Sequence, residues 1–136
     1  MSPNTTIIIH TDGAARGNPG PAAIGVTLHD DRGKLLAEIS ERIGVATNNV
    51  AEYRAAIEGL KKAIQLGARE VKLVSDSELV VRLINGRYKV KNAGIIPLYG
   101  EVVKLAGRLE KFTATNVRRG QNAAADGLAN EALDRE

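Results

Sequence analysis

The sequence contains no cysteine and no tryptophan among its 136 residues. Without cysteine there are no disulfides, no thiolate nucleophile and no thiolate zinc site, and the cytoplasm is the simplest expected location. Aromatic residues make up only 3% of the chain, which argues against a platform that stacks the bases of a single strand. No apolar run is long enough to span a bilayer, and the segment MSPNTT lacks the basic-then-apolar order of a secretory signal. We therefore expect no membrane association.

The composition and the length of the chain are those of a single globular domain. Apolar residues make up 43% of the chain and charged residues 26%, which is typical of a soluble globular protein. The net charge of +3 gives a weak bias toward polyanionic partners. A chain of 136 residues can form one domain with its own core but not two ordinary domains. We expect a single domain over residues 1–136, one site and a monomer.

Three strands are predicted first. Residues 6–12 are apolar on both sides, as in the central strand of a covered sheet. Residues 22–30 and 34–43 alternate apolar and polar side chains. The turn Asp30-Asp31-Arg32-Gly33 between them predicts an antiparallel hairpin.

The rest of the chain alternates helices with single strands. Apolar spacing predicts helices over 49–66, 76–85, about 95–110 and about 122–134, and strands over 70–75 and 112–117. Helices that connect strands in this order imply an α/β fold with a five-stranded mixed sheet flanked by helices on both faces. The first and fourth strands are then expected to be parallel neighbours.

Carboxylates stand at the ends of four predicted elements. They are Asp12 at the end of the first strand, Glu52 at the beginning of the first helix, Asp76 at the end of the fourth strand and Asp126 near the start of the last helix. Because the carboxyl ends of parallel neighbours lie side by side, Asp12 and Asp76 are expected to be close. Close carboxylates repel one another unless protons or cations intervene, so the cluster predicts hard ions with oxygen ligands, Mg²⁺ or Mn²⁺.

Each of these acids also has a structural interpretation that the sequence leaves open. Glu52 follows Asn49 by three residues, the spacing of a capping box. Asp76 would be an acid in the first turn of a helix, where it complements the helix dipole. Asp126 would be a solvated charge on a helix face, and Asp12 a turn residue. Taken singly, none of the four identifies an enzyme.

Four ordered segments resemble motifs of the ribonuclease H type 1 family. They are TDGAARGNPG from Thr11, TNNVAEYRAAIEGL from Thr47, VSDSELVVRLING from Val74 and QNAAADGLANEA from Gln121, and the match covers nearly the whole chain. The resemblance implies a ribonuclease H-like fold. It also implies a site in which two Mg²⁺ or Mn²⁺ ions are bound by the catalytic residues Asp12, Glu52, Asp76 and Asp126.

The activity that the resemblance implies is hydrolysis of the RNA strand of an RNA/DNA hybrid by a two-metal mechanism. The products would carry 3′-hydroxyl and 5′-phosphate ends. Two other classes of function stay open: a hybrid-binding module without catalysis, and another nuclease of the same fold, such as a resolvase or a transposase-like enzyme. The four acids argue against the first, because uncompensated acids weaken the binding of phosphates.

The resemblance further implies a set of substrate contacts: Gly13, Asn18, Thr47, Asn48, Asn49, Glu78, Arg118 and Asn122. The glycine-rich loop after Asp12 would bring the backbone close to RNA. The asparagines would reach 2′-hydroxyls and base edges in the minor groove, and Thr47 would help to hold a phosphate of the DNA strand. Helix capping is the alternative role of Asn48 and Asn49.

The sequence departs from the family pattern in two places. Many members have a histidine before the last helix, whereas this chain has Arg118 and Arg119. We favour Arg118 as the phosphate contact, and an arginine cannot act as a general base. Some relatives insert a basic helix with tryptophans where this chain has only Arg87-Tyr88-Lys89-Val90-Lys91-Asn92, either a phosphate contact or a solvated loop. We therefore expect modest affinity for the hybrid and strong dependence on salt.

Overall fold

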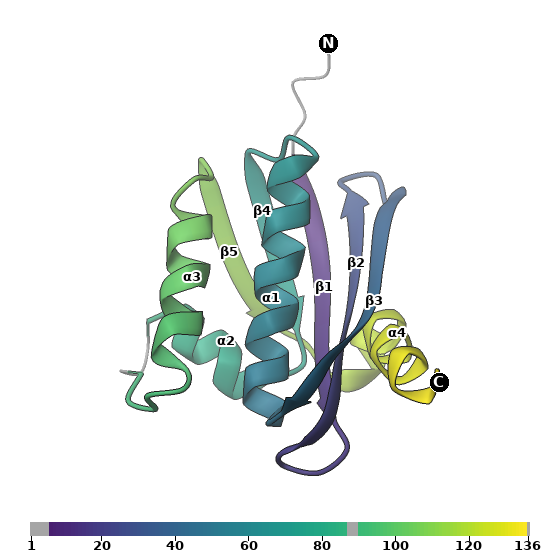
Figure 1. The fold of residues 1–136 in the computed structure, drawn as a ribbon. Coiled ribbons are helices and arrows are strands. Elements are labelled where there is room, and N and C mark those ends of the chain that lie inside the picture. Colours follow the sequence, from purple (N-terminus) through teal and green to yellow (C-terminus); the bar gives the residue numbers. More distant parts are fainter. Residues whose placement is uncertain (1–5, 87–89, 136) are drawn as a thin grey trace.

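The computed structural model describes residues 6–86 and 90–135 (Figure 1). The first five residues, the last residue and the short segment 87–89 lie outside the described part. Two charges of the predicted basic loop, Arg87 and Lys89, therefore lie outside the described residues, and their proposed phosphate contacts stay predictions.

A five-stranded mixed sheet forms the centre of the fold, with the strand order β3-β2-β1-β4-β5. The strands are β1 (Thr6–Ala15), β2 (Gly20–Asp30), β3 (Leu35–Ala46), β4 (Glu70–Ser75) and β5 (Lys111–Asn116). Strand β1 pairs antiparallel with β2 and parallel with β4. The predicted hairpin and the predicted parallel pairing of the first and fourth strands are both confirmed.

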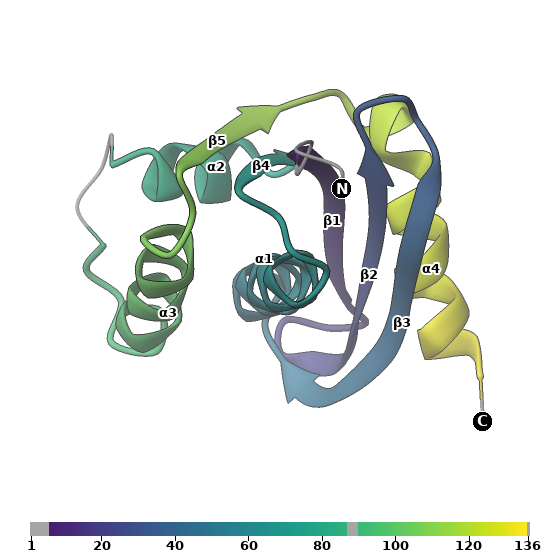
Figure 2. The ribbon, with the colours of Figure 1, turned by 90° about the horizontal axis from the view of Figure 1, so that it is seen from above.

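Helices cover both faces of the sheet. They are α1 (Asn48–Gln65), α2 (Glu78–Ile84), α3 (Ile96–Ala106) and α4 (Ala123–Asp134), and a short 3₁₀ helix, Arg119–Asn122, leads into α4. Figure 2 shows α1 and α3 on one face and α4 on the other, against β1, β2 and β3. The predicted α/β class is therefore confirmed. Within the described part of the chain, no helix is both long enough and apolar enough to cross a membrane.

Several predicted boundaries were wrong. Strand β1 continues three residues past Asp12, because the segment up to Ala15 still pairs with β2. Helix α2 begins at Glu78 and not at residue 76, since the hydroxyl of Ser77 accepts from the backbone N of Val80 at 3.3 Å and caps the helix. Helix α3 ends at Ala106 instead of residue 110. The last helix is preceded by the 3₁₀ turn, which periodicity did not reveal.

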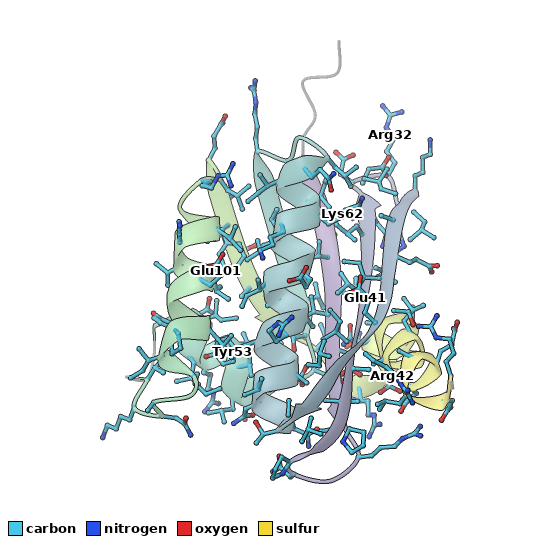
Figure 3. All side chains as sticks on the ribbon, viewed as in Figure 1. Arg32, Glu41, Arg42, Tyr53, Lys62 and Glu101 are labelled. Carbon is cyan, nitrogen blue, oxygen red and sulfur yellow. The ribbon has the colours of Figure 1, made fainter. Side chains whose placement is uncertain are left out.

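The main core lies between the sheet and α1, and α3 closes its outer side. Its large, fully buried side chains include Ile9, Ile24, Leu28, Tyr53, Leu60 and Leu73. Tyr53 lies between α1 and α3 (Figure 3), and burial raises the pKa of its hydroxyl to about 12. On the other face, Arg42 of β3 donates to the carbonyl oxygens of Ala132 and Leu133, each at 3.1 Å (Figure 3). These bonds satisfy carbonyls at the C-terminal end of α4 and hold that helix against the sheet.

Candidate active site

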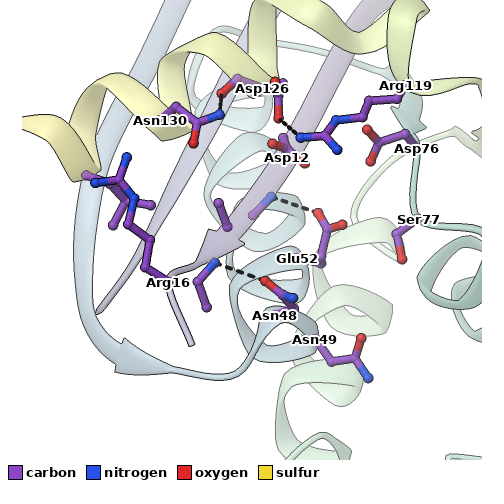
Figure 4. A pocket seen from close by; sticks show the side chains of 14 residues that line it. Asp12, Arg16, Asn48, Asn49, Glu52, Asp76, Ser77, Arg119, Asp126 and Asn130 are labelled. Atoms are coloured by element: carbon purple, nitrogen blue, oxygen red, sulfur yellow. Dashed lines mark hydrogen bonds and ion pairs between the residues drawn. The ribbon is translucent and has the colours of Figure 1, made fainter. Parts of the chain in front are cut away.

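The carboxyl ends of β1 and β4 meet at one edge of the sheet. The last parallel pair is Thr11 beside Ser75, so the next residues, Asp12 and Asp76, follow on adjacent strands. One carboxylate oxygen each from Asp12, Glu52 and Asp76 lies within 4.8 Å of the others (Figure 4). The expected proximity of Asp12 and Asp76 is confirmed, although Asp12 lies inside β1 rather than at its end.

Glu52 reaches this edge from the first turns of α1. The N-cap of α1 is Thr47, whose hydroxyl accepts from the backbone N of Val50 at 3.2 Å. Asn48 and Asn49 are therefore not N-caps, and the capping-box interpretation of Glu52 was wrong. Instead, the backbone N of Gly13 donates to Oε1 of Glu52 at 2.7 Å. This bond fixes the carboxylate of α1 against β1.

Asp76 lies in the turn between β4 and α2. The N-cap of α2 is Ser77, so Asp76 precedes the helix and the interpretation as a first-turn acid was wrong. The turn is held on both sides: the backbone N of Ser77 donates to the hydroxyl of Ser75 at 3.0 Å, and the backbone N of Val117 donates to the carbonyl of Ser75 at 2.9 Å. Asp76 is thus presented to the cluster by a turn anchored to β5.

Asp126 completes the group from the first turn of α4. It lines the same cleft of about 530 Å³ as the other three acids. The other lining residues are Gly13, Ala14, Ala15, Arg16, Asn48, Asn49, Ser77, Arg119, Asn130 and Leu133. Four carboxylates far apart in the sequence therefore face one cleft. Three come from β1, α1 and the turn between β4 and α2, and the fourth comes from α4 on the opposite face of the sheet.

Arg119 is the arginine that faces the acids. Its Nη2 lies 3.4 Å from Oδ1 of Asp126, and its side chain lines the cleft (Figure 4). Arg118 is the N-cap of the 3₁₀ helix, is exposed and does not line the cleft; its backbone N donates to the side chain of Gln121 at 3.4 Å. The geometry favours Arg119 over Arg118, because the 3₁₀ turn directs the second arginine toward Asp126, and the contact of either with a phosphate stays a prediction.

Burial and mutual repulsion raise the pKa values of the clustered acids. Burial, followed by the charge of Asp76, raises the pKa of Asp12 to about 8, and Asp12 is only 5% exposed. Burial, followed by the charge of Asp12, raises the pKa of Glu52 to about 8. Burial also raises the pKa of Asp76, and the positive charge of Arg119 opposes that rise. Each carboxyl is thus costly to ionise unless positive charge enters the cleft.

The cluster fits a divalent metal ion. Its donors are carboxylate oxygens, the ligands that hard cations prefer, and they converge from three elements within 4.8 Å. A bound cation would remove the repulsion that raises the pKa values of Asp12 and Glu52. The structure therefore contains a carboxylate cluster able to hold a divalent ion.

The chain is similar to known proteins in sequence and in fold. The sequence model of a family described as reverse transcriptase-like matches residues 10–132. The crystal structure of RNase H1 from Halobacterium salinarum aligns with a TM-score of 0.92 at 39% identity, over 95% of this chain and 98% of that one. The chain belongs to the ribonuclease H type 1 family.

Among other similar proteins, two are longer chains that this chain matches only in part, and one has been solved in complex with an RNA/DNA hybrid. A bifunctional protein of Mycobacterium tuberculosis is 45% identical over 94% of this chain and 35% of its own length. Ribonuclease HI of Halobacterium salinarum is 41% identical over 90% of this chain and 62% of its own length. The crystal structure of LC11-RNase H1, isolated from compost, in complex with an RNA/DNA hybrid has a TM-score of 0.89 at 43% identity, over 94% of this chain and 96% of that one. This chain spans about a third of the first relative and less than two thirds of the second.

Asn48 and Asn49 line the cleft, and Asn18 lies beside Asn48. Oδ1 of Asn48 accepts from the backbone N of Ala15 at 2.9 Å, and Oδ1 of Asn18 accepts from the backbone N of Asn48 at 3.0 Å. Both side chains are exposed, and their Nδ2 groups have no partner among the described residues. Asn49 is exposed and also lines the cleft. These amides can therefore donate to acceptors of a bound nucleic acid.

Two of the implied substrate contacts point elsewhere. Asn122 is 2% exposed, its Nδ2 donates to the carbonyl of Thr11 at 2.9 Å and its Oδ1 lies 3.2 Å from Nδ1 of His10. It ties the 3₁₀ helix to β1 beside Asp12, which is a positioning role, and its contact with substrate stays a prediction. Glu78 is exposed on α2, forms an ion pair with Arg82 at 3.0 Å and does not line the cleft.

Three polar residues of the cleft were missed by the sequence analysis, Arg16, Ser77 and Asn130, and a fourth, Arg119, was placed second to Arg118. One signal was available for Asn130, which stands four residues after Asp126 and so lies on the same face of a helix. Arg16 stands inside the first family motif, but nothing in its spacing indicates that a strand carries it toward α4. The orientation of Arg119 toward Asp126 depends on the 3₁₀ turn.

The stability of the metal-free protein is expected to fall as the pH rises from about 4 to about 8. The folded pKa values of Asp12 and Glu52, about 8, lie above their ordinary values of 3.8 and 4.5. Their contribution to stability is therefore complete below the ordinary values and is lost as the pH rises through about 8. Tm measured with EDTA should fall across this range, and added Mg²⁺ should raise Tm most near pH 8. A rise in Tm with pH in EDTA would contradict this expectation.

Proposed function

We propose that this protein is a metal-dependent endoribonuclease that hydrolyses the RNA strand of RNA/DNA hybrids, leaving 3′-hydroxyl and 5′-phosphate ends. The observation that carries the proposal is the convergence of Asp12, Glu52, Asp76 and Asp126 in one cleft. Membership of the ribonuclease H type 1 family supports it. The similar LC11-RNase H1 binds an RNA/DNA hybrid, which supports the choice of substrate.

Two Mg²⁺ or Mn²⁺ ions would be held by these four carboxylates. When bound, such ions stabilise charge on the attacking and leaving oxygens of a phosphodiester. The chain's own part is to hold the ligands in place. The backbone N of Gly13 orients Glu52, the turn at Ser75 orients Asp76, and Asn122 fixes the approach to α4.

Recognition of the two strands would be divided among side chains at the N-terminal end of α1 and in the loop between β1 and β2. The amide Nδ2 groups of Asn18 and Asn48 would donate to the 2′-hydroxyl oxygens and base edges of the minor groove, with Asn49 beside them. Thr47 would hold a phosphate of the DNA strand. Its Oγ1 accepts from Val50 and still has a hydroxyl hydrogen to donate.

We also propose that residues 1–136 act as a single catalytic unit and as a monomer. All four carboxylates of the cleft come from one chain, which supports the monomer. Size-exclusion chromatography with light scattering would test it. The cytoplasmic location stays a prediction from the lack of cysteine.

Arg119→Ala is expected to lower kcat for hybrid hydrolysis by about a hundredfold. The guanidinium lies beside Asp126 and opposes the rise in the pKa of Asp76, so it supplies positive charge where the phosphate would sit. Arg118→Ala is the matched control, because it removes the same charge one residue away without touching the cleft. Steady-state kinetics should show a large loss only for Arg119→Ala; equal losses in both variants would indicate a general effect of charge.

The proposed function is tested with four labelled substrates: RNA/DNA, RNA/RNA, DNA/DNA and single-stranded RNA. Each is incubated with Mg²⁺ or Mn²⁺ and then with excess EDTA, and the product ends are identified by ligation and phosphatase treatment. We expect metal-dependent cleavage of the RNA strand of the hybrid. Hybrid binding without cleavage would favour a binding module, and cleavage of DNA duplexes would favour another nuclease of the same fold.

A further inference from the structure

Beyond the four carboxylates the cleft is also lined by Arg16, Asn130 and Leu133, and we call this part of the cleft the arm. This arm lies between the C-terminal end of β1 and the outer turns of α4 (Figure 4). Asp126, Asn130 and Asp134 stand four residues apart on α4, so they follow one another along one face of that helix. At about 1.5 Å per residue, Asp134 lies about 12 Å beyond Asp126 along the axis.

Arg16 is held at the far end of this arm by an ion pair with Asp134. The side chains are 50% and 66% exposed, and exposed pairs of this kind contribute only about 0–1 kcal/mol to stability. The ion pair uses one guanidinium nitrogen, Nη2, whereas an arginine has five N–H donors. Arg16 can therefore bind a second anion, or exchange partners, at little cost.

The charge balance of the cleft favours a phosphate at Arg16. Among the described residues that line the cleft, the cations are Arg16 and Arg119, against four carboxylates. Arg119 lies beside Asp126 and compensates the carboxylate cluster. Arg16 lies beyond Asn130, away from that cluster, so that only its ion-pair partner Asp134 and none of the four clustered carboxylates competes there with a phosphate (Figure 4).

Asn130 adds a preference for ribose. Its Nδ2 donates to the carbonyl of Asp126 at 3.0 Å, which leaves Oδ1 as an acceptor in a residue that lines the cleft. A 2′-hydroxyl can donate to such an acceptor, and deoxyribose has no equivalent group. The strand that occupies the arm would therefore be RNA.

We infer that Arg16 and Asn130 form a second subsite for the RNA strand, in which Arg16 binds a backbone phosphate a few nucleotides from the scissile one and Asn130 accepts from a 2′-hydroxyl. This inference rests on the proposed function, because it takes an RNA strand to lie in the cleft. The subsite contributes affinity and register along the RNA, and the bond-breaking chemistry stays at the carboxylates. Arg16 and Asn130 are thus substrate-binding residues.

The test compares Arg16→Leu with Asp134→Asn in the full chain. The two variants break the same ion pair from opposite sides, but only the first removes the proposed phosphate contact. Kd for a labelled RNA/DNA hybrid is measured by fluorescence anisotropy with Ca²⁺ over a series of salt concentrations, and Tm is measured by circular dichroism. Arg16→Leu should weaken binding about tenfold and lower the slope of log Kd against log salt by about one, whereas Asp134→Asn should bind as tightly as the wild type or more tightly.

A second measurement tests the ribose contact. Hybrids that carry one 2′-deoxynucleotide at successive positions of the RNA strand should reveal a position where wild-type binding weakens, and Asn130→Leu should lose that sensitivity. Unchanged binding by Arg16→Leu, or an equal loss in Asp134→Asn, would overturn the inference and leave a structural ion pair. Hybrid binding without cleavage by the wild type would refute the proposed function only, and no hybrid binding would refute both.

Discussion

Asp12→Asn is expected to abolish hydrolysis of the hybrid and, at the same time, to stabilise the metal-free protein. The loss of activity follows from the position of Asp12, whose carboxylate lies within 4.8 Å of those of Glu52 and Asp76. Removing one negative ligand weakens the hold on the divalent ions that would stabilise the transition state. We expect the rate to fall by about a thousandfold or more, measured with saturating Mg²⁺ and again with Mn²⁺.

The gain in stability has a different cause, which is the cost of burying an ionised carboxyl. Burial and the charge of Asp76 raise the pKa of Asp12 to about 8, so near pH 8 the folded protein carries a partly ionised carboxyl that is expensive to bury. An amide of the same shape has no such cost. In EDTA near pH 8, Asp12→Asn should raise the free energy of unfolding by about 2 kcal/mol, and near pH 3, below the ordinary pKa of 3.8, Asp12 is largely neutral in both states and the gain should be close to zero.

Urea denaturation at the two pH values measures this difference. Asp31→Asn is the matched control, because Asp31 lies exposed in the hairpin turn far from the cluster and should change neither activity nor stability by much. A variant that is inactive but less stable than the wild type near pH 8 would show that Asp12 holds the fold together through its hydrogen bonds.

The order of the elements and the position of three carboxylates could be predicted from the sequence because both depend on local patterns. Apolar alternation marks the strands, helical spacing marks α1, and the parallel rule then brings Asp12 beside Asp76. The extension of β1 to Ala15 was missed, because glycine and two alanines have no strand signature of their own. Their strand conformation comes from pairing with β2.

Individual contacts were harder to predict. Asn122 is a polar residue in a family motif, but its hydrogen bond joins it to Thr11, which stands 111 residues earlier in the chain. Arg118 and Arg119 are chemically identical neighbours, and only a single 3₁₀ turn decides which one faces Asp126. A bond over that distance has no periodic signal, and one turn is too short to leave one.

For Gly13 of the first motif, the sequence and the structure give different reasons why the residue is small. The sequence suggests that Gly13 is small so that RNA can approach. In the structure its neighbour on the side of the missing side chain is the protein itself: a Cβ at Gly13 would lie 2.2 Å from the carbonyl carbon of Ala51 and 2.3 Å from the backbone N of Glu52. The absence of a side chain lets β1 and α1 approach closely enough for Gly13 to bind Glu52.

Gly13→Ala is therefore expected to destabilise the protein and to inactivate it. The obstructing atoms belong to the backbone of α1, so the methyl group can be accommodated only if β1 or α1 moves. We expect a loss of about 3 kcal/mol or more in the free energy of unfolding, measured by urea denaturation. Because the same movement lengthens the 2.7 Å bond to Glu52, hydrolysis of the hybrid should fall even at temperatures where the variant is folded.

Gly100→Ala is the matched control for this variant. Gly100 lies in α3, and a Cβ there would have no atom within 4 Å, so the substitution adds a methyl group without a clash. Alanine also has the higher helix propensity, and the control should gain up to about 1 kcal/mol with unchanged activity. If Gly13→Ala were as stable and as active as Gly100→Ala, β1 and α1 would not be in the close contact that positions Glu52.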